Sequence, residues 1–193
     1  SSRLPVFLGT MPLREYTFHT TDVFTSTRFG GNQLAVLPDA RGLTTEEMHA
    51  IAREFNYSES TFVLPPDDAA HTRRVRIFTP GGEVPFAGHP TVGTALVLAE
   101  LREIPLTGDE TAIVFEEGVG PVRVSIRATD GVATFAELSV AKLPEILPPV
   151  PGPEVLAPML SLGESDLAGG AFHPQAVSCG SWTCCRRSSS TSS

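Results

Sequence analysis

The chain has 193 residues and a formal net charge of −8, with 41% hydrophobic and 19% charged residues. This composition predicts a soluble globular protein with one sizeable core or two small domains. The acidic balance argues against nucleic acid or an acidic membrane surface as partner, and no apolar run is long enough to span a bilayer.

The first strands are expected shortly after the start of the chain. We interpret residues 1–10 as a leader or tag and place an N-terminal domain at residues 13–142. Alternation of apolar and polar side chains predicts strands at 16–24 and 33–37. The glycine-rich loop between them ends at Asn32, which could present its amide to a ligand, although asparagine is also a common turn residue.

A helix is predicted from Thr44 to Asn56. Thr44 and Glu47 have the spacing of a capping box, in which each side chain bonds the other's backbone N–H. Apolar residues recur with helical spacing over the following turns, which indicates one buried face. The next strand is expected at 60–64, stopped by two prolines.

We identify residues 76–100 as the segment around which the domain is built: a strand, a glycine- and proline-rich loop at 80–85, then a helix. Pro90 suits the first helical position, because its missing N–H would have no intrahelical partner. Residues 91–101 are apolar on nearly every face, which is typical of a helix surrounded by protein. The free N–H groups at its start could seat an anion or a carboxylate.

Three further strands are predicted at 111–115, 121–126 and 133–138, joined by glycine-containing turns. With the two helices they indicate an α+β domain, with a largely antiparallel sheet curled around the central buried helix.

Beyond this domain the sequence changes character. We expect a proline-rich linker at 143–153, a short helix within 154–162, and the incomplete start of a second domain at 154–180. Residues 181–193 have no folding pattern, which predicts a disordered tail and suggests a frame shift near Gly180. The three cysteines all lie in the last fifteen residues. The body therefore has no disulfide framework or thiolate metal site, and a cytoplasmic location is the simplest interpretation.

Two residues are candidates for chemistry, each with a plainer alternative. Glu59 lies between a helix end and a strand start, where a carboxylate partly removed from water could act as general base and acid. By spacing alone, a solvated loop glutamate is the commoner case. His89 could bind a substrate carboxylate or move a proton, but a lone histidine is more often a capping or packed residue.

Other polar residues carry weaker signals. Gly88 is needed either for a tight turn or for close approach of a ligand. Glu83 is expected to face solvent. The remaining histidines show no metal-ligand spacing, so no metal site is predicted.

Five blocks, taken in order, resemble the PhzF-like phenazine-biosynthesis family. They are Asp22–Phe24, Phe29–Val36, Asn56–Val63, Arg76–Pro80 and Pro85–Gly93, and the resemblance extends over roughly residues 13–180. It implies the fold of diaminopimelate epimerase, in which two similar α+β domains enclose the active site between them.

The resemblance also implies roles for single residues. Glu59 matches the glutamate that moves the proton in the phenazine isomerase, and Gly88 and His89 match residues that line its substrate site. Asn32 and Ser58 lie in the matching blocks and are further candidates for substrate binding. Related epimerases carry a cysteine where this chain has Ala87, and alanine cannot be a base, so a two-thiol mechanism is excluded.

We therefore expect a cofactor-independent isomerase that acts on a small carboxylate-bearing substrate, such as a cyclic amino acid, with Glu59 as general acid and base. The matching family motif of the second domain is not found after Gly180, so the chain is expected to be truncated or frame-shifted and to carry half a site. An exposed inner face predicts a homo-oligomer. The alternatives are a non-catalytic small-molecule-binding protein and an inactive, self-associating fragment.

Overall fold

The computed structural model describes residues 14–139, 152–159 and 161–166 of the chain. The chain divides into two compact units, and residues 14–139 belong to the first while 152–166 belong to the second. Within the described residues, no helix combines the length and apolar character needed to cross a membrane. The predictions for residues 1–10, for residues 143–151 of the linker predicted at 143–153, and for the tail at 181–193 fall outside the described ranges.

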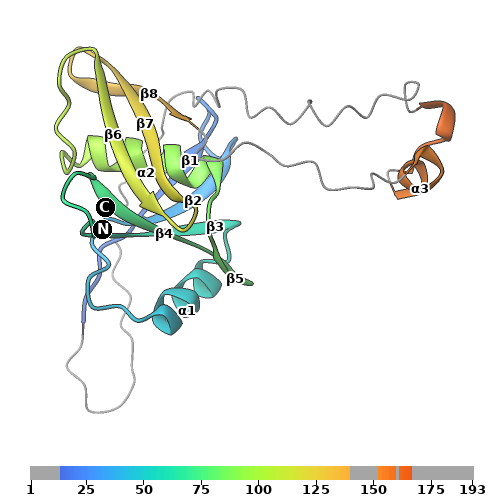
Figure 1. Cartoon of the computed structure of the whole chain (residues 1–193), viewed down its shortest axis with the longest axis horizontal. Helices are drawn as coiled ribbons and strands as arrows, with labels where there is room; N and C mark the ends of the chain where they lie inside the picture. Colours follow the sequence, from blue (N-terminus) through green and yellow to red (C-terminus); the bar gives the residue numbers. More distant parts are fainter. Residues whose placement is uncertain (1–13, 140–151, 160, 167–193) are drawn as a thin grey trace. The chain divides into compact units, whose positions relative to one another are not determined.

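The described part of the first unit contains one curled sheet and two helices (Figure 1). Its strands are β1 (His19–Val23), β2 (Asn32–Leu37), β3 (Glu59–Leu64), β4 (Arg73–Thr79), β5 (Gly82–Val84), β6 (Glu110–Glu117), β7 (Gly120–Thr129) and β8 (Val132–Ser139). The order is β1-β2-β3-β4-β6-β7-β8, with β5 paired to β4. Five pairings are antiparallel, and β2–β3 and β4–β6 are parallel. The predicted α+β class with a mostly antiparallel sheet is confirmed.

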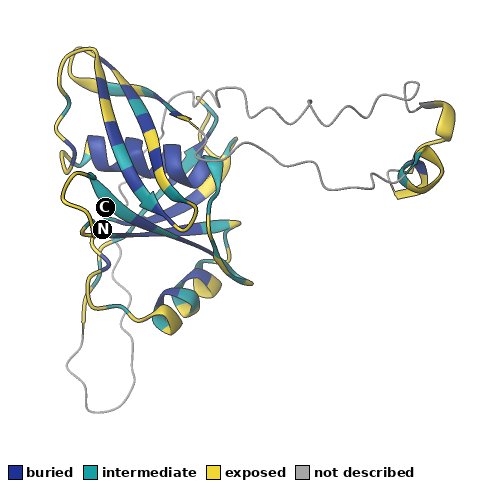
Figure 2. Ribbon diagram, in the orientation of Figure 1, coloured by how far each residue is buried: buried dark blue, intermediate teal, exposed yellow. Residues whose placement is uncertain are grey.

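Strand β3 is buried on both faces because a helix covers each side. Helix α1 (Thr45–Phe55) lies against one face and helix α2 (Gly88–Glu100) against the other (Figures 1 and 2). Successive residues of a strand point to opposite faces. On β3, Phe62 accordingly packs with α1 residues and Val63 with α2 residues.

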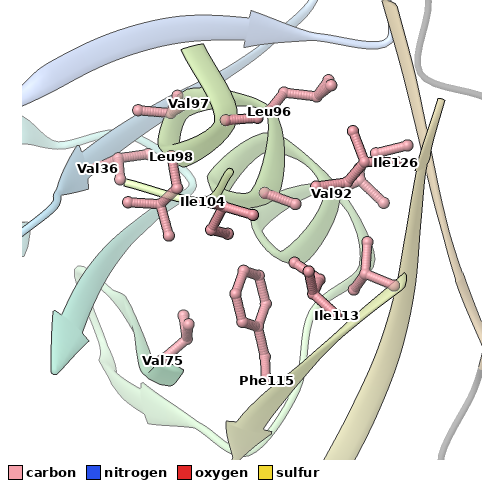
Figure 3. Close-up of a cluster of buried hydrophobic side chains, with 14 of the residues drawn as sticks. Val36, Val75, Val92, Leu96, Val97, Leu98, Ile104, Ile113, Phe115 and Ile126 are labelled. Atoms are coloured by element: carbon pink, nitrogen blue, oxygen red, sulfur yellow. The ribbon is translucent and has the colours of Figure 1, made fainter. Parts of the chain in front are cut away.

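Helix α2 is almost wholly enclosed: 11 of its 13 residues are buried. Figure 3 shows its apolar side chains gathered with those of the surrounding strands, namely Val36, Val75, Val92, Leu96, Val97, Leu98, Ile113, Phe115 and Ile126, together with Ile104. An apolar surface on every side is what a helix inside a protein requires, so the sequence prediction of a buried helix is confirmed.

Gly93 allows α2 to approach β1 and β2 closely. A Cβ at this position would lie 2.6 Å from Leu34 Cδ2 and 2.7 Å from a methyl group of Val23. At the next residue of the helix, the buried hydroxyls of Thr94 and Thr61 lie 2.8 Å apart and join α2 to β3. The helix therefore has a defined depth and rotation against the sheet, which places its first turn.

Helix α1 begins and ends as its sequence predicts. The Thr44 hydroxyl accepts from the backbone N–H of Glu47, and the Glu47 carboxylate accepts from the backbone N–H of Thr44. Asn56 ends the helix in the left-handed conformation, with φ of 53°. Asparagine tolerates this conformation better than most residues.

Two details of the central segment differ from the predictions, and a third is extended. The loop at 80–85 contains a strand, β5, which pairs with β4. Pro90 is the third residue of α2 rather than the first, because the helix already begins at Gly88; the third N–H is also without an intrahelical partner, so proline is tolerated there. Glu83 is exposed, as predicted, and both of its oxygens also accept from Arg76, at 2.6 and 2.7 Å.

In the second unit, the described residues form helix α3 (Pro153–Met159) and a short 3₁₀ helix at Glu164–Asp166. The helix is shorter than the predicted 154–162 and contains Pro158 near its end. It begins at Pro153, which the prediction had assigned to the linker. Proline suits the first position of a helix.

Candidate active site

The starts of three elements meet at one edge of the sheet. Strands β2 and β3 are parallel, with Leu34 opposite Glu59, so Asn32 and Glu59 both lie where their strands begin. The beginnings of adjacent parallel strands lie at the same edge of a sheet. Helix α2 begins there as well and brings in His89 at its second residue.

Glu59 and His89 face one another in a largely buried place. Glu59 Oε2 lies 3.3 Å from His89 Nε2, and the side chains are 20% and 9% exposed. The contact does not have the angles of a full hydrogen bond, and neither atom has another hydrogen-bond partner among the described residues. Two buried, reactive atoms are therefore held next to each other without being engaged elsewhere.

A chain of hydrogen bonds reaches the other side of the His89 ring. The Ser58 hydroxyl donates to Asn32 Oδ1 at 3.0 Å, and Asn32 Nδ2 lies 3.1 Å from His89 Nδ1. Because Ser58 occupies the amide oxygen, the Asn32 NH₂ group is the donor to the ring. His89 Nδ1 then accepts, which puts the ring proton of neutral His89 on Nε2, facing Glu59.

The surroundings of His89 favour the neutral form of its imidazole ring. Burial lowers the pKa of His89 below its ordinary value of 6.5, while the negative charge of Glu59 and a backbone hydrogen bond at Gln33 act in the opposite direction. A neutral ring matches the donor assignment, because only a neutral ring has a nitrogen that accepts from Asn32. At neutral pH the contact with Glu59 is therefore an N–H group facing a carboxylate.

The first turn of α2 offers backbone donors beside this pair. Ala87 precedes the helix and makes no side-chain cap, and the first turn contains no acidic residue. The backbone N–H of Thr91 bonds the Ala87 carbonyl at 3.3 Å, so the N–H groups of Gly88 and His89 precede the first intrahelical bond. Such groups, together with the helix dipole, favour a negatively charged group.

All five residues proposed from the sequence lie around this edge. Asn32, Ser58, Glu59 and His89 are joined by the contacts described above, and Gly88 is adjacent to His89 in the first turn of α2. Their roles in binding and catalysis stay predictions.

Sequence reasoning missed one further buried acid, Glu117, at the end of β6. A signal was present, because Thr111, Ile113 and Phe115 alternate on the inward face of β6 and Glu117 continues that series. A glutamate in a core-facing position of a strand is unusual.

An open hollow of about 510 Å³ lies on another part of the sheet, between β4, β5, β6 and the start of β7. Neither Glu59 nor His89 lines it. Its lining is mostly charged, including Arg74, Glu83 and Glu116. Across residues 14–139 and the described parts of the second unit, no three His, Cys, Asp or Glu side chains gather as a metal site would require.

Comparison with known proteins gives related isomerases and epimerases. Over 159 residues the chain is 50% identical to an uncharacterized isomerase of Mesorhizobium japonicum, and the match covers 81% of this chain and 50% of that protein. Over 117 residues it is 52% identical to a trans-2,3-dihydro-3-hydroxyanthranilate isomerase of Pseudomonas fluorescens, covering 61% and 40% respectively. A solved structure described as a predicted epimerase of Pseudomonas aeruginosa superposes with a TM-score of 0.62 at 30% identity, covering 80% and 53%.

The chain thus spans about half the length of the curated relatives it matches. A family model described as phenazine biosynthesis-like protein matches residues 21–191. That match begins within β1 and includes the rest of the described sheet, and it runs past Gly180 into the residues for which the sequence predicts a disordered tail. The match covers most of the chain, which therefore belongs to the phenazine biosynthesis-like (PhzC-PhzF) family.

Proposed function

We propose that the chain carries the proton-transfer half of a cofactor-independent isomerase, in which Glu59 is the general acid and base. The contact between Glu59 Oε2 and His89 Nε2 at 3.3 Å is the observation that supports this most directly. Both atoms are buried and lack other hydrogen-bond partners among the described residues, so they are available to a substrate.

The proposed reaction moves one proton within a single molecule. The Glu59 carboxylate removes a proton from a carbon atom of the substrate, and the resulting carboxylic acid returns it to another carbon of the same molecule. No oxidant, reductant or second substrate is needed. His89 is kept neutral by burial, so it does not compete for the proton, and its Nε2–H is available to hold Glu59 or a substrate oxygen.

The substrate is expected to carry a carboxylate. The N–H groups at the start of α2 favour an anion beside the Glu59–His89 pair, and no side chain caps them. We propose trans-2,3-dihydro-3-hydroxyanthranilate, the compound named for the related Pseudomonas enzymes, as the first compound to test. By analogy with the diaminopimelate epimerase fold, a second domain would complete the site. The homo-oligomeric state and the cytoplasmic location stay predictions.

Isotope exchange distinguishes catalysis from mere binding. The chain is incubated in D₂O with trans-2,3-dihydro-3-hydroxyanthranilate, deuterium in recovered substrate and product is measured by mass spectrometry, and affinity is measured by calorimetry. Glu59→Gln should lower exchange at least about 100-fold, the range expected for loss of a general base, while affinity changes little. Glu54→Gln is the matched control, because Glu54 is an exposed glutamate of α1.

Retention of full exchange by Glu59→Gln would reject Glu59 as the base. Binding without exchange by the wild-type chain would favour a non-catalytic binding protein. Absence of both would count against the proposed function of this chain by itself.

A further inference from the structure

Glu117 is a buried acid that the proposed reaction does not use. It is the last residue of β6 and is 8% exposed. Its Oε1 lies 2.7 Å from the Thr91 hydroxyl on α2, while Oε2 is buried with no hydrogen-bond partner among the described residues. A buried carboxylate with one free oxygen is costly, which raises the question of its protonation state.

The hydroxyl of Thr91 has more acceptors than protons to give. It lies 2.8 Å from the Ala87 carbonyl oxygen and 2.7 Å from Glu117 Oε1. A hydroxyl has one proton to donate, and both an ionised carboxylate and a carbonyl only accept. With Glu117 ionised, one of these two short contacts would have no proton in it.

We infer that Glu117 is kept as a neutral carboxylic acid and acts as a positioning residue for the start of α2. Its O–H donates to the Thr91 hydroxyl, and the Thr91 O–H donates to the Ala87 carbonyl. Both short contacts are then hydrogen bonds, and the unpartnered Oε2 belongs to a neutral group. These two hydrogen bonds, from Glu117 to Thr91 and from Thr91 to Ala87, form a relay. The relay holds Ala87, the residue before the first turn that contains His89.

The turn between β6 and β7 holds the same segment at a second point. The backbone N–H of Val119 donates to the Pro85 carbonyl at 2.9 Å. A Cβ on Gly118 would lie 2.8 Å from Pro85 Cα, so this close approach requires glycine. The three consecutive residues 117–119 therefore contact the chain on both sides of His89, at Pro85 before it and at Thr91 after it.

Among the residues that the structure describes, no positive charge pairs with Glu117. The hollow beside it is lined by charged groups from β4, β5, β6 and the β3–β4 connection, namely Asp67, Asp68, His71, Arg74, Arg76, Glu83 and Glu116. Arg76 pairs with Glu83, Arg74 pairs with Asp67, and His71 pairs with Glu116. The hollow's lining from β7 is uncharged, and α2 presents Thr91. In agreement, burial raises the pKa of Glu117 to about 7, with the Thr91 hydrogen bond acting in the opposite direction.

The relay makes a spectroscopic prediction that does not depend on turnover. The relay rests on the proposed function only in that His89 is treated as the substrate-facing group, and all of its tests are made without substrate. With ¹³C-labelled glutamate in the full chain, one carboxyl resonance should titrate with a midpoint near pH 7. Glu117→Gln should remove that resonance and assign it.

The ring signals of His89 report whether the relay positions the helix start. In the wild-type chain they should shift with a second inflection near pH 7, when Glu117 loses its proton. Glu117→Gln should abolish this inflection, because the glutamine amide donates to Thr91 at every pH. Thr91→Val should abolish it as well while the Glu117 resonance still titrates, and Thr91→Ser should restore it.

Two results would overturn the inference. The first is that no glutamate carboxyl resonance titrates between pH 6 and 8, a range of roughly one unit on either side of the expected midpoint. The wild-type chain alone is enough to test this. The other is persistence of the His89 inflection in both Glu117→Gln and Thr91→Val. Loss of isomerase activity with these signals intact would count against the proposed reaction and would not contradict the relay.

Discussion

The stability of the folded chain should depend on pH through Glu117, and Glu117→Gln should remove that dependence. The glutamine amide has nearly the same shape as the acid and donates to the Thr91 hydroxyl, so the contact at 2.7 Å can be kept. The difference between the two proteins is then the titration of one group. Thermodynamic linkage converts that titration into a free energy.

The size and sign of this pH dependence follow from the pKa of Glu117, which burial raises from the ordinary value of 4.5 to about 7. Between these values the folded chain holds a proton that the unfolded chain has released. Unfolding therefore releases a proton, and the free energy of unfolding falls as pH rises, by about 1.4 kcal/mol per pH unit. The total loss is about 3 kcal/mol, complete near pH 7, and the dependence vanishes above that pH.

Urea denaturation at a series of pH values tests this. The free energy of unfolding of wild type and Glu117→Gln is obtained by linear extrapolation at each pH from about 5 to about 8. The variant should become more stable relative to wild type as pH rises towards 7. The titration of His89, whose pKa burial lowers, makes stability rise with pH up to about 6.5. It is common to both proteins and cancels in the difference.

Glu83→Gln is the control, because Glu83 lines the same hollow but has the opposite pKa shift. Hydrogen bonds from Arg76 lower the pKa of Glu83, so this group stays ionised across the range. Its replacement should change stability by an amount that does not vary with pH. If the wild-type and Glu117→Gln curves instead run parallel from pH 5 to 7.5, Glu117 is ionised in the folded chain and the reasoning fails.

Three further substitutions test other parts of the structure. Thr44→Ala should lower the free energy of unfolding by about 1 kcal/mol because α1 loses its cap, whereas Thr44→Ser keeps a capping hydroxyl and should not lower it. Urea denaturation measures both changes. Gly93→Ala should destabilise by about 1–3 kcal/mol in the same assay, since its methyl group would lie 2.6 Å from Leu34 Cδ2; equal or greater stability would refute the close approach. Asn32→Asp should raise the pKa of His89, because a carboxylate favours a protonated ring over a neutral one; NMR titration of the ring measures this pKa.

Much of the local structure follows from the sequence because its causes are local. The capping box of Thr44 and Glu47 specifies the start of α1, and both of its hydrogen bonds are present. Asp130 and Gly131, with φ of 52° and 74°, form the tight turn between β7 and β8 that their residue types predict. Helix α2 is apolar on every face, which already indicates that protein surrounds it.

The grouping of Asn32, Ser58, Glu59 and His89 was expected by resemblance to a family, whereas spacing alone gave no reason for it. Asn32 and Glu59 come together because β2 and β3 pair in parallel, and such pairing depends on packing between distant segments. The depth at which α2 sits depends on Gly93 against Leu34 and Val23, a contact that no local pattern records.

By itself, the sequence determined the types of the elements, the ends of α1, the burial of α2 and the presence of an acid and a histidine at the starts of two elements. Only the tertiary structure decided the neutral state of His89, the direction of its Nε2–H and the burial of Glu117. The physical reason is that protonation depends on which groups surround a side chain and how far water is excluded. Those groups come from strands and helices far apart along the chain.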